Sequence, residues 1–319
     1  MAPDAAPLDV AVAVDLGGTK VDAALVDAGG RIVPGSRHRE PTGPGQSPES
    51  LTAAIRSVCR RATDAAGPAH RLIGVGIGAA GPLRGDGTRI SPLNMPGIRD
   101  FALPEAVAPV APIAAPGAPG GVDLPVRVAL DGTCIALAEL RFGALRGIRN
   151  GIALVVSTGI GGGIVIDGRV VRGDTGNAGH VGQSWVRRPD PSDAVLATVE
   201  AVASGPATVR WANAHGWPGS DGRRLAADHR AGDPVAVRAV RRSAEAVGQA
   251  LAAYAALLDI RVAAIGGGFA NVADDYLALV EAAAHRVALL PAAAELRVVP
   301  AELGDDAPLV GAALLVHDG

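Results

Sequence analysis

The sequence predicts an α/β protein built from two lobes. Its 319 residues are enough for two compact lobes, each with its own hydrophobic core. Short apolar segments typical of strands alternate with longer segments of helical periodicity. Each half opens with predicted β-structure that carries a glycine and threonine turn, at Gly17–Thr19 and at Thr158–Gly159. This weak similarity between the two halves indicates a duplicated α/β lobe with a ligand between the halves.

Composition narrows the class of protein. Hydrophobic residues make up 49% of the chain but aromatic residues only 3%, so the cores must consist of Ala, Val, Leu and Ile. A net charge of −3 gives no basic footprint for nucleic acid. The two cysteines, Cys59 and Cys134, fit a reduced cytosol. We see no signal-peptide pattern and no apolar run of membrane-spanning length, so we expect a soluble, cytoplasmic protein.

The first half is expected to be a meander of strands, then a helix and a further strand. After an Ala- and Pro-rich leader at residues 1–8, the strands are Val10–Val14, Val21–Val26, one near Ile32 and, beyond the helix, Leu72–Ile77. The sequence DLGGTK joins the first two strands, unlike the strand-to-helix junction of a P-loop or a Rossmann site. Ser47 with Ser50 can cap the helix, which runs to about Ala66.

A stretch rich in Ala, Pro and Gly, Pro104–Pro125, separates the halves. It is either a mobile hinge between the lobes or a surface insertion. We expect residues 1–124 to form a small lobe that residues 305–319 complete, and residues 125–304 to form a large lobe.

The second half is expected to open with a strand, Val126–Leu130, that ends at Asp131, where a helix begins. Two further strands are Ile152–Val156 and Ile164–Ile166. A turn at Ser157–Ile160 follows the first strand, the glycines Gly161–Gly163 lead into the second, and Asp167-Gly168 makes a tight turn. Such hairpins let a ligand approach the backbone closely. The remaining elements are helical stretches at Ala194–His215, Pro234–Leu258, Tyr276–Leu289 and Ala307–Val316, with strands at Ile260–Ile265 and Leu296–Val299.

The glycine turns have a chemical interpretation. Asp15, at a strand end, could hold Mg²⁺ through water, since hard cations prefer oxygen ligands and keep much of their hydration. The glycines and Thr19 that follow can donate to phosphate oxygens. Gly266–Gly268, between a strand and a helix, could let an adenine ring lie on bare backbone. The alternative is an ordinary glycine hairpin with a solvated aspartate.

Together these motifs resemble the ROK family (repressors, open reading frames and sugar kinases) of the actin/hexokinase/Hsp70 ATPase superfamily. The resemblance runs from about Val10 to Leu315 and rests on VDLGGTK, GAAGP, ISPLNMPG, ALDGTCIALAE, STGIGGGIVIDG, GNAGHVGQ, EAVASGPA, IGGG and GDDAPLVGAA. It implies a two-lobed actin-like ATPase (ribonuclease H-like) fold, with the active site in the interlobe cleft. It also implies transfer of phosphate from Mg·ATP to a sugar hydroxyl. The ATP-binding residues it implies are Asp15, Gly17, Gly18, Thr19, Lys20, Thr158, Gly159, Gly161, Gly162, Gly267 and Gly268.

The resemblance also implies residues for the acceptor. Asp131 would be the general base on the sugar hydroxyl, in keeping with phosphoryl transfer, which needs an oriented nucleophile and neutralised phosphate charge. The alternative is a simple helix N-cap. Asn94 would contact sugar hydroxyls, since an amide both donates and accepts, or it is only a turn residue. Glu200 would be a second sugar-contacting acid, or it lies on a solvated helix face.

The sequence departs from the family in three respects. Leu130 stands where the family usually has Asn directly before the base. His180 and Gln183 replace the Glu and His of the family's Glu-x-Gly-His, and we keep both as expected substrate-binding residues. The family's cysteine-rich zinc loop is absent, because Val186–Ala194 contains no cysteine. We therefore expect no structural zinc.

These departures leave several alternatives. Exchanged hydroxyl partners change which substrate pairs fully with the site, and a sugar-like C7-cyclitol, which some family members phosphorylate, would suit the altered pocket. His180 could instead serve as another hydroxyl partner, with glucose or an amino sugar still the substrate, or catalysis could be lost. A non-catalytic sugar-binding or sensing protein is the rival class. A repressor is disfavoured, because a helix-turn-helix domain has no room ahead of Asp15. We expect a homodimer.

Overall fold

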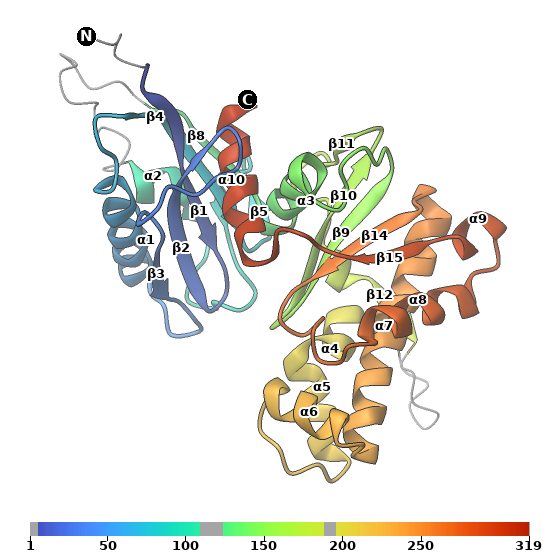
Figure 1. Ribbon diagram of the computed structural model, residues 1–319. Coiled ribbons are helices and arrows are strands. Elements are labelled where there is room, and N and C mark those ends of the chain that lie inside the picture. Colours follow the sequence, from blue (N-terminus) through green and yellow to red (C-terminus); the bar gives the residue numbers. More distant parts are fainter. Residues whose placement is uncertain (1–5, 109–123, 188–195, 319) are drawn as a thin grey trace. The chain divides into compact units, whose positions relative to one another are not determined.

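The computed structural model of the chain describes residues 6–108, 124–187 and 196–318. The chain forms two compact units (Figure 1). Unit 1 consists of residues 1–138, 172–178 and 306–319, and unit 2 of residues 139–171 and 179–305. The chain therefore passes from unit 1 to unit 2 inside helix α3 (Asp131–Phe142).

Unit 1 is built on a five-stranded sheet with the order β3-β2-β1-β4-β8. Its strands are β1 (Leu8–Leu16), β2 (Lys20–Asp27), β3 (His38–Pro41), β4 (His70–Ala79) and β8 (Val126–Leu130). Helices α1 (Pro48–Thr63) and α10 (Ala307–His317) lie beside this sheet (Figure 1). Val75 and Ile77 of β4 join the buried cluster of α1, whereas the intervening Gly76 lies against Ala312 of α10. The two helices therefore cover opposite faces.

Short elements complete unit 1. They are β5 (Leu83–Arg84), β6 (Arg89–Ile90), β7 (Phe101–Ala102), α2 (Leu103–Val107) and the 3₁₀ turn η2 (Gly304–Asp306) before α10. Residues 172–178 are tied to β5 by one side chain, because Asn177 Oδ1 accepts from the Leu83 N–H at 2.7 Å and its Nδ2 donates to the Leu83 carbonyl at 2.9 Å.

Unit 2 repeats the sheet of unit 1. Its order is β11-β10-β9-β14-β15, formed by β9 (Gly151–Val156), β10 (Ile160–Ile166), β11 (Arg169–Val170), β14 (Val262–Gly266) and β15 (Arg297–Pro300). In both sheets the central strand is antiparallel to the strand that follows it and parallel to a later one. The weak similarity between the two halves of the sequence thus corresponds to two sheets of the same topology.

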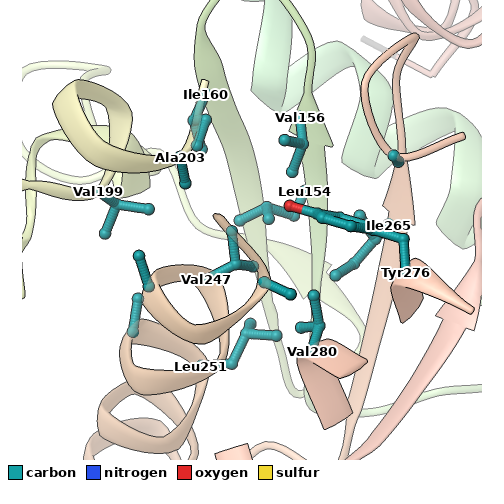
Figure 2. Close-up of a cluster of buried hydrophobic side chains, with 14 of the residues drawn as sticks. Leu154, Val156, Ile160, Val199, Ala203, Val247, Leu251, Ile265, Tyr276 and Val280 are labelled. Carbon is teal, nitrogen blue, oxygen red and sulfur yellow. The ribbon is translucent and has the colours of Figure 1, made fainter. Parts of the chain in front are cut away.

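Helices cover the unit 2 sheet with a largely aliphatic core. They are α4 (Val199–Ala203), α5 (Gly205–Ala214), α6 (Gly222–Arg230), α7 (Pro234–Leu258), α8 (Tyr276–Val287) and α9 (Pro291–Ala294), and the hairpin of β12 (Trp185–Arg187) with β13 (Leu196–Thr198) precedes them. Figure 2 shows Val247 and Leu251 of α7 packed toward Leu154 and Ile265 of the sheet. Tyr276 is one of its aromatic members, with Trp217 and Phe269, and its buried hydroxyl contacts Ser243 Oγ at 2.8 Å.

Three element predictions need correction. Ile32 makes only an isolated bridge, and the third strand is β3, because Pro34 and Gly35 (φ +78°) interrupt the chain between them. The second strand of this hairpin begins at Ile160 and not at Ile164, since Ile160 already pairs with Val156 and the glycines Gly161–Gly163 lie inside β10. The expected helix over 194–215 begins only at Val199, after strand β13, and it is divided at Ser204, whose extended backbone ends α4 and whose hydroxyl caps α5.

The division between the units falls later than the expected boundary at residue 124. The reason is that β8 pairs in parallel with β4, which places residues 124–138 in unit 1. Residues 1–5 of the leader and 109–123 of the Pro-rich stretch lie outside the described residues. Among those described, both cysteines are buried free thiols, and no helix is long and apolar enough to cross a bilayer.

Candidate functional site

Unit 1 places two carboxylates at one edge of its sheet. Asp15 lies near the end of β1, where it pairs with Asp22 of β2 and Gly78 of β4. Asp131 follows β8 directly and begins α3, and its Oδ1 accepts the Gly132 N–H at 2.7 Å. Asp15 is only 7% exposed. Burial and then the charge of Asp131 raise the pKa of Asp15 to about 7. A bound cation would relieve this repulsion.

An ion cluster around the buried Asp22, beside this edge, was not anticipated from the sequence. Asp22 is fully buried, with Lys20 Nζ 3.6 Å, Arg37 Nη2 3.3 Å and Arg39 Nε 2.5 Å from its carboxylate oxygens. Burial alone would raise the pKa of Asp22, but the hydrogen bond from Arg39 and the neighbouring cations lower it. The cluster holds the Lys20 ammonium at the end of the glycine turn. The available sequence signal was an aspartate at a core-facing position of an apolar strand.

The turn Gly17–Thr19 is fixed from outside by Thr42. The Thr42 N–H donates to the Thr19 carbonyl and its hydroxyl donates to the Gly17 carbonyl, both at 3.0 Å. Asn94 also reaches this turn, because its amide lies against the Cα of Gly18. Unit 1 therefore brings together the predicted residues Asp15, Gly17, Gly18, Thr19, Lys20, Asn94 and Asp131.

Unit 2 forms its glycine turn between β9 and β10, and a carboxylate from α4 faces it. Glu200 Oε2 accepts the Ile160 N–H at 2.8 Å and would lie 2.7 Å from a Cβ at Gly159. Gln183 Nε2 donates to the other Glu200 oxygen at 3.3 Å. Glu200 is thus turned toward the backbone at Thr158–Ile160.

The glycines of unit 2 fall into two kinds. A Cβ at Gly162 would lie 2.5 Å from the Ala153 carbonyl oxygen, and one at Gly267, where φ is +99°, would lie 2.5 Å from that of Val156. The protein itself therefore requires glycine at both. A Cβ at Gly161 would meet nothing within 4 Å, and one at Gly268 only Ser157 Oγ at 3.9 Å, with neither φ in the left-handed region. Their bare backbone leaves room for a ligand.

His180 precedes the 3₁₀ turn η1 (Val181–Gln183). Partial burial lowers the pKa of His180, which Glu200 opposes, so the imidazole is neutral at pH 7. The turn is fastened by Tyr254 of α7, whose hydroxyl donates to the Val181 carbonyl at 2.8 Å and also contacts Ser184 Oγ. The sequence analysis missed Tyr254 and Ser184, since both look like ordinary helix and loop residues.

The predictions about bound metal can be compared with the described residues alone. Within the described ranges, no group of three or more His, Cys, Asp or Glu side chains is placed to hold a metal ion. The absence of structural zinc stays a prediction, because residues 188–195 of the relevant loop are not described. The acidic edge of unit 1 fits a hydrated cation held by few protein ligands, as is usual for Mg²⁺.

Comparison with known proteins adds the family. The model of the ROK family matches residues 11–319. The chain is 32% identical over 314 residues to an N-acetylmannosamine kinase of Escherichia coli O139:H28, which covers 96% of this chain and 98% of that one. It is 33% identical over 340 residues to a glucokinase of Streptomyces coelicolor, which covers 98% of both chains.

Solved structures agree with these sequence matches. A ROK family glucokinase from Streptomyces griseus, in complex with glucose and AMPPNP, has a TM-score of 0.79 at 31% identity, with 97% of this chain and all of that chain covered. A ROK hexokinase from Thermus thermophilus has a TM-score of 0.76 at 34% identity and the same coverage. The predicted actin-like ATPase fold is thereby confirmed. This chain belongs to the ROK family.

Proposed function

We propose that the chain is an ATP-dependent kinase that transfers the γ-phosphate to a hydroxyl of a sugar or sugar-like cyclitol. The observation that carries the proposal is the pair of the buried Asp15 and the partly buried Asp131 at one edge of the unit 1 sheet, in a chain whose relatives are sugar kinases. Phosphoryl transfer requires an oriented nucleophile, which Asp131 would supply, and neutralised phosphate charge, which a cation held by Asp15 would supply.

Asp131 would act as the general base. The N–H of Gly132 fixes the direction of the carboxylate, which would accept the proton as the acceptor hydroxyl attacks phosphorus. Asp15 would hold a hydrated Mg²⁺, which supplies positive charge to the phosphates when bound. Lys20, held by Asp22 at 3.6 Å, adds a fixed positive charge at the turn.

The nucleotide would lie on the backbone of the glycine turns. Gly17, Gly18 and Thr19 in unit 1 and Thr158, Gly159, Gly161 and Gly162 in unit 2 would offer N–H groups or a hydroxyl to phosphate oxygens. Gly267 and Gly268 would line the adenosine pocket. The open space above Gly161 and Gly268 supports this assignment, because no contact within the protein requires glycine there.

The acceptor would be read by Asn94, His180, Gln183 and Glu200 besides Asp131. A neutral imidazole at His180 both donates and accepts one hydrogen bond, whereas a carboxylate only accepts, so the two recognise different hydroxyl patterns. Together with the apolar Leu130, this favours a cyclitol over a hexopyranose. A homodimer and the non-catalytic sugar-binding alternative stay open.

The test is ADP release with Mg·ATP and glucose, N-acetylmannosamine, N-acetylglucosamine or a valienol-type cyclitol as acceptor. Asp131→Asn runs beside the native protein. We expect turnover on one acceptor and a loss of kcat by about a hundredfold or more in the variant. Preference for glucose would contradict the cyclitol assignment. Sugar binding without ADP release would favour the non-catalytic alternative.

A further inference from the structure

The amide of Asn94 rests on Gly18. A Cβ at Gly18 would overlap Asn94 Nδ2 and lie 2.5 Å from its Cγ and 3.1 Å from its Oδ1. Gly18 is outside the left-handed region, so its backbone conformation alone does not demand glycine. The contact with Asn94 is what leaves no space for a side chain there.

Both sides of this contact are anchored. Thr42 holds the turn of Gly18 through hydrogen bonds to the carbonyls on either side of it. The loop that carries Asn94 is anchored by Met95 and Ile98, which are fully buried. A methyl group at position 18 would therefore displace the end of the Asn94 side chain, which is the freest part of the contact.

Asn94 is itself available to a ligand. The residue is exposed, and its amide has no hydrogen-bond partner among the described residues of the chain. An exposed amide seated against backbone, with its donors and acceptor unused, is suited to a polyhydroxylated molecule.

We propose that Gly18 is a positioning residue for the acceptor. Because Gly18 has no side chain, the Asn94 amide packs against its backbone and is thereby directed at the substrate hydroxyls. This rests on the proposed function. The proposal gives the two glycines of the GGT turn different roles, since a Cβ at Gly17 would not touch Asn94 and would meet only the Lys20 carbonyl at 3.4 Å. The missing side chain of Gly17 would serve the phosphates, whereas that of Gly18 would serve the acceptor, and the Gly18 N–H, which Gly18→Ala keeps, stays available to phosphate.

The experiment is a double-mutant cycle of Gly18→Ala and Asn94→Ala, with Gly17→Ala as the matched glycine variant. The acceptor KM and the ATP KM are measured for each protein. We expect Gly18→Ala to raise the acceptor KM by about tenfold, the effect of a lost hydrogen bond, and to change the ATP KM far less. Asn94→Ala should do the same, and the double variant should be no worse than Asn94→Ala. In Gly17→Ala the larger change should be in the ATP KM.

Additive losses in the double variant, or a rise mainly in the ATP KM of Gly18→Ala, would overturn the assignment. A second measurement keeps this separate from the kinase proposal. The chain has five asparagines, so the Asn94 side-chain amide signals in a ¹H–¹⁵N spectrum can be assigned by their loss in Asn94→Ala. Without any ligand, Gly18→Ala should shift them clearly more than Gly17→Ala does. Equal shifts would refute the packing of Asn94 on Gly18 even if the protein proves to be a kinase. A selective shift without turnover would refute the kinase proposal alone.

Discussion

The two glycine turns occupy the same place in two sheets of one topology, yet they are equipped differently. In unit 1 the strand that enters the turn carries Asp15, and the strand that leaves it carries Lys20 and Asp22. In unit 2 the corresponding strands are apolar or glycine, and a carboxylate reaches the turn only from α4, through Glu200. One copy of the sheet thus concentrates charge, and the other exposes bare backbone.

This difference shows how a repeated scaffold can acquire two roles. A buried charge must be compensated by opposite charges, and in unit 1 three cations surround the Asp22 carboxylate. Bare backbone needs only the absence of side chains, which Gly161 and Gly268 provide without any contact that demands glycine. Substitutions in the two turns should therefore fail in different ways, in unit 1 through electrostatics and in unit 2 through ligand contact.

The largest effect on stability is expected at Asp22. Asp22→Asn removes the carboxylate that Lys20, Arg37 and Arg39 share and should lower the free energy of unfolding by about 3 kcal/mol, because the three cations lose their buried partner, although Arg37 keeps its ion pair with Asp306. The measurement is urea unfolding. The matched control in unit 2 is Asp167→Asn, whose ion pair with Arg149 is exposed and should contribute less than about 1 kcal/mol. Equal losses would mean that burial of Asp22 does not matter.

The glycine pair in β10 gives the next largest effect. Gly162→Ala should lower the free energy of unfolding by about 2 kcal/mol, since the new methyl group would press on the Ala153 carbonyl. Gly161→Ala should leave stability almost unchanged and instead raise the ATP KM several-fold. Thermal unfolding and ADP release on both variants check this. An unaltered ATP KM in Gly161→Ala would show that the nucleotide does not contact Gly161.

The sequence predicted the architecture better than the contacts within it. β8 and α7 were predicted with the observed bounds, because apolar runs and Pro or Asp boundaries are local signals. The glycines of β10 were expected ahead of the strand, because the sequence does not show which residue pairs with Val156. Likewise, the sequence places Gly18 and Asn94 far apart in the chain and gives no sign that they touch. Contacts of this kind depend on tertiary packing, which no local pattern encodes.

The smallest effect concerns the pH dependence of stability without metal. The native Asp15 carboxyl has its pKa raised to about 7, whereas in the unfolded chain it ionises near its ordinary value of 3.8. Between these values the folded protein binds the extra proton, so its stability must fall as the pH rises through this window. From pH 6 to pH 7 the loss should be about 1 kcal/mol from this group. Asp15→Asn, which cannot ionise, should lose less over the same interval in urea unfolding with EDTA present. If both proteins respond equally to pH, Asp15 is already ionised in the folded state, and the charged edge of unit 1 is better solvated than its burial indicates.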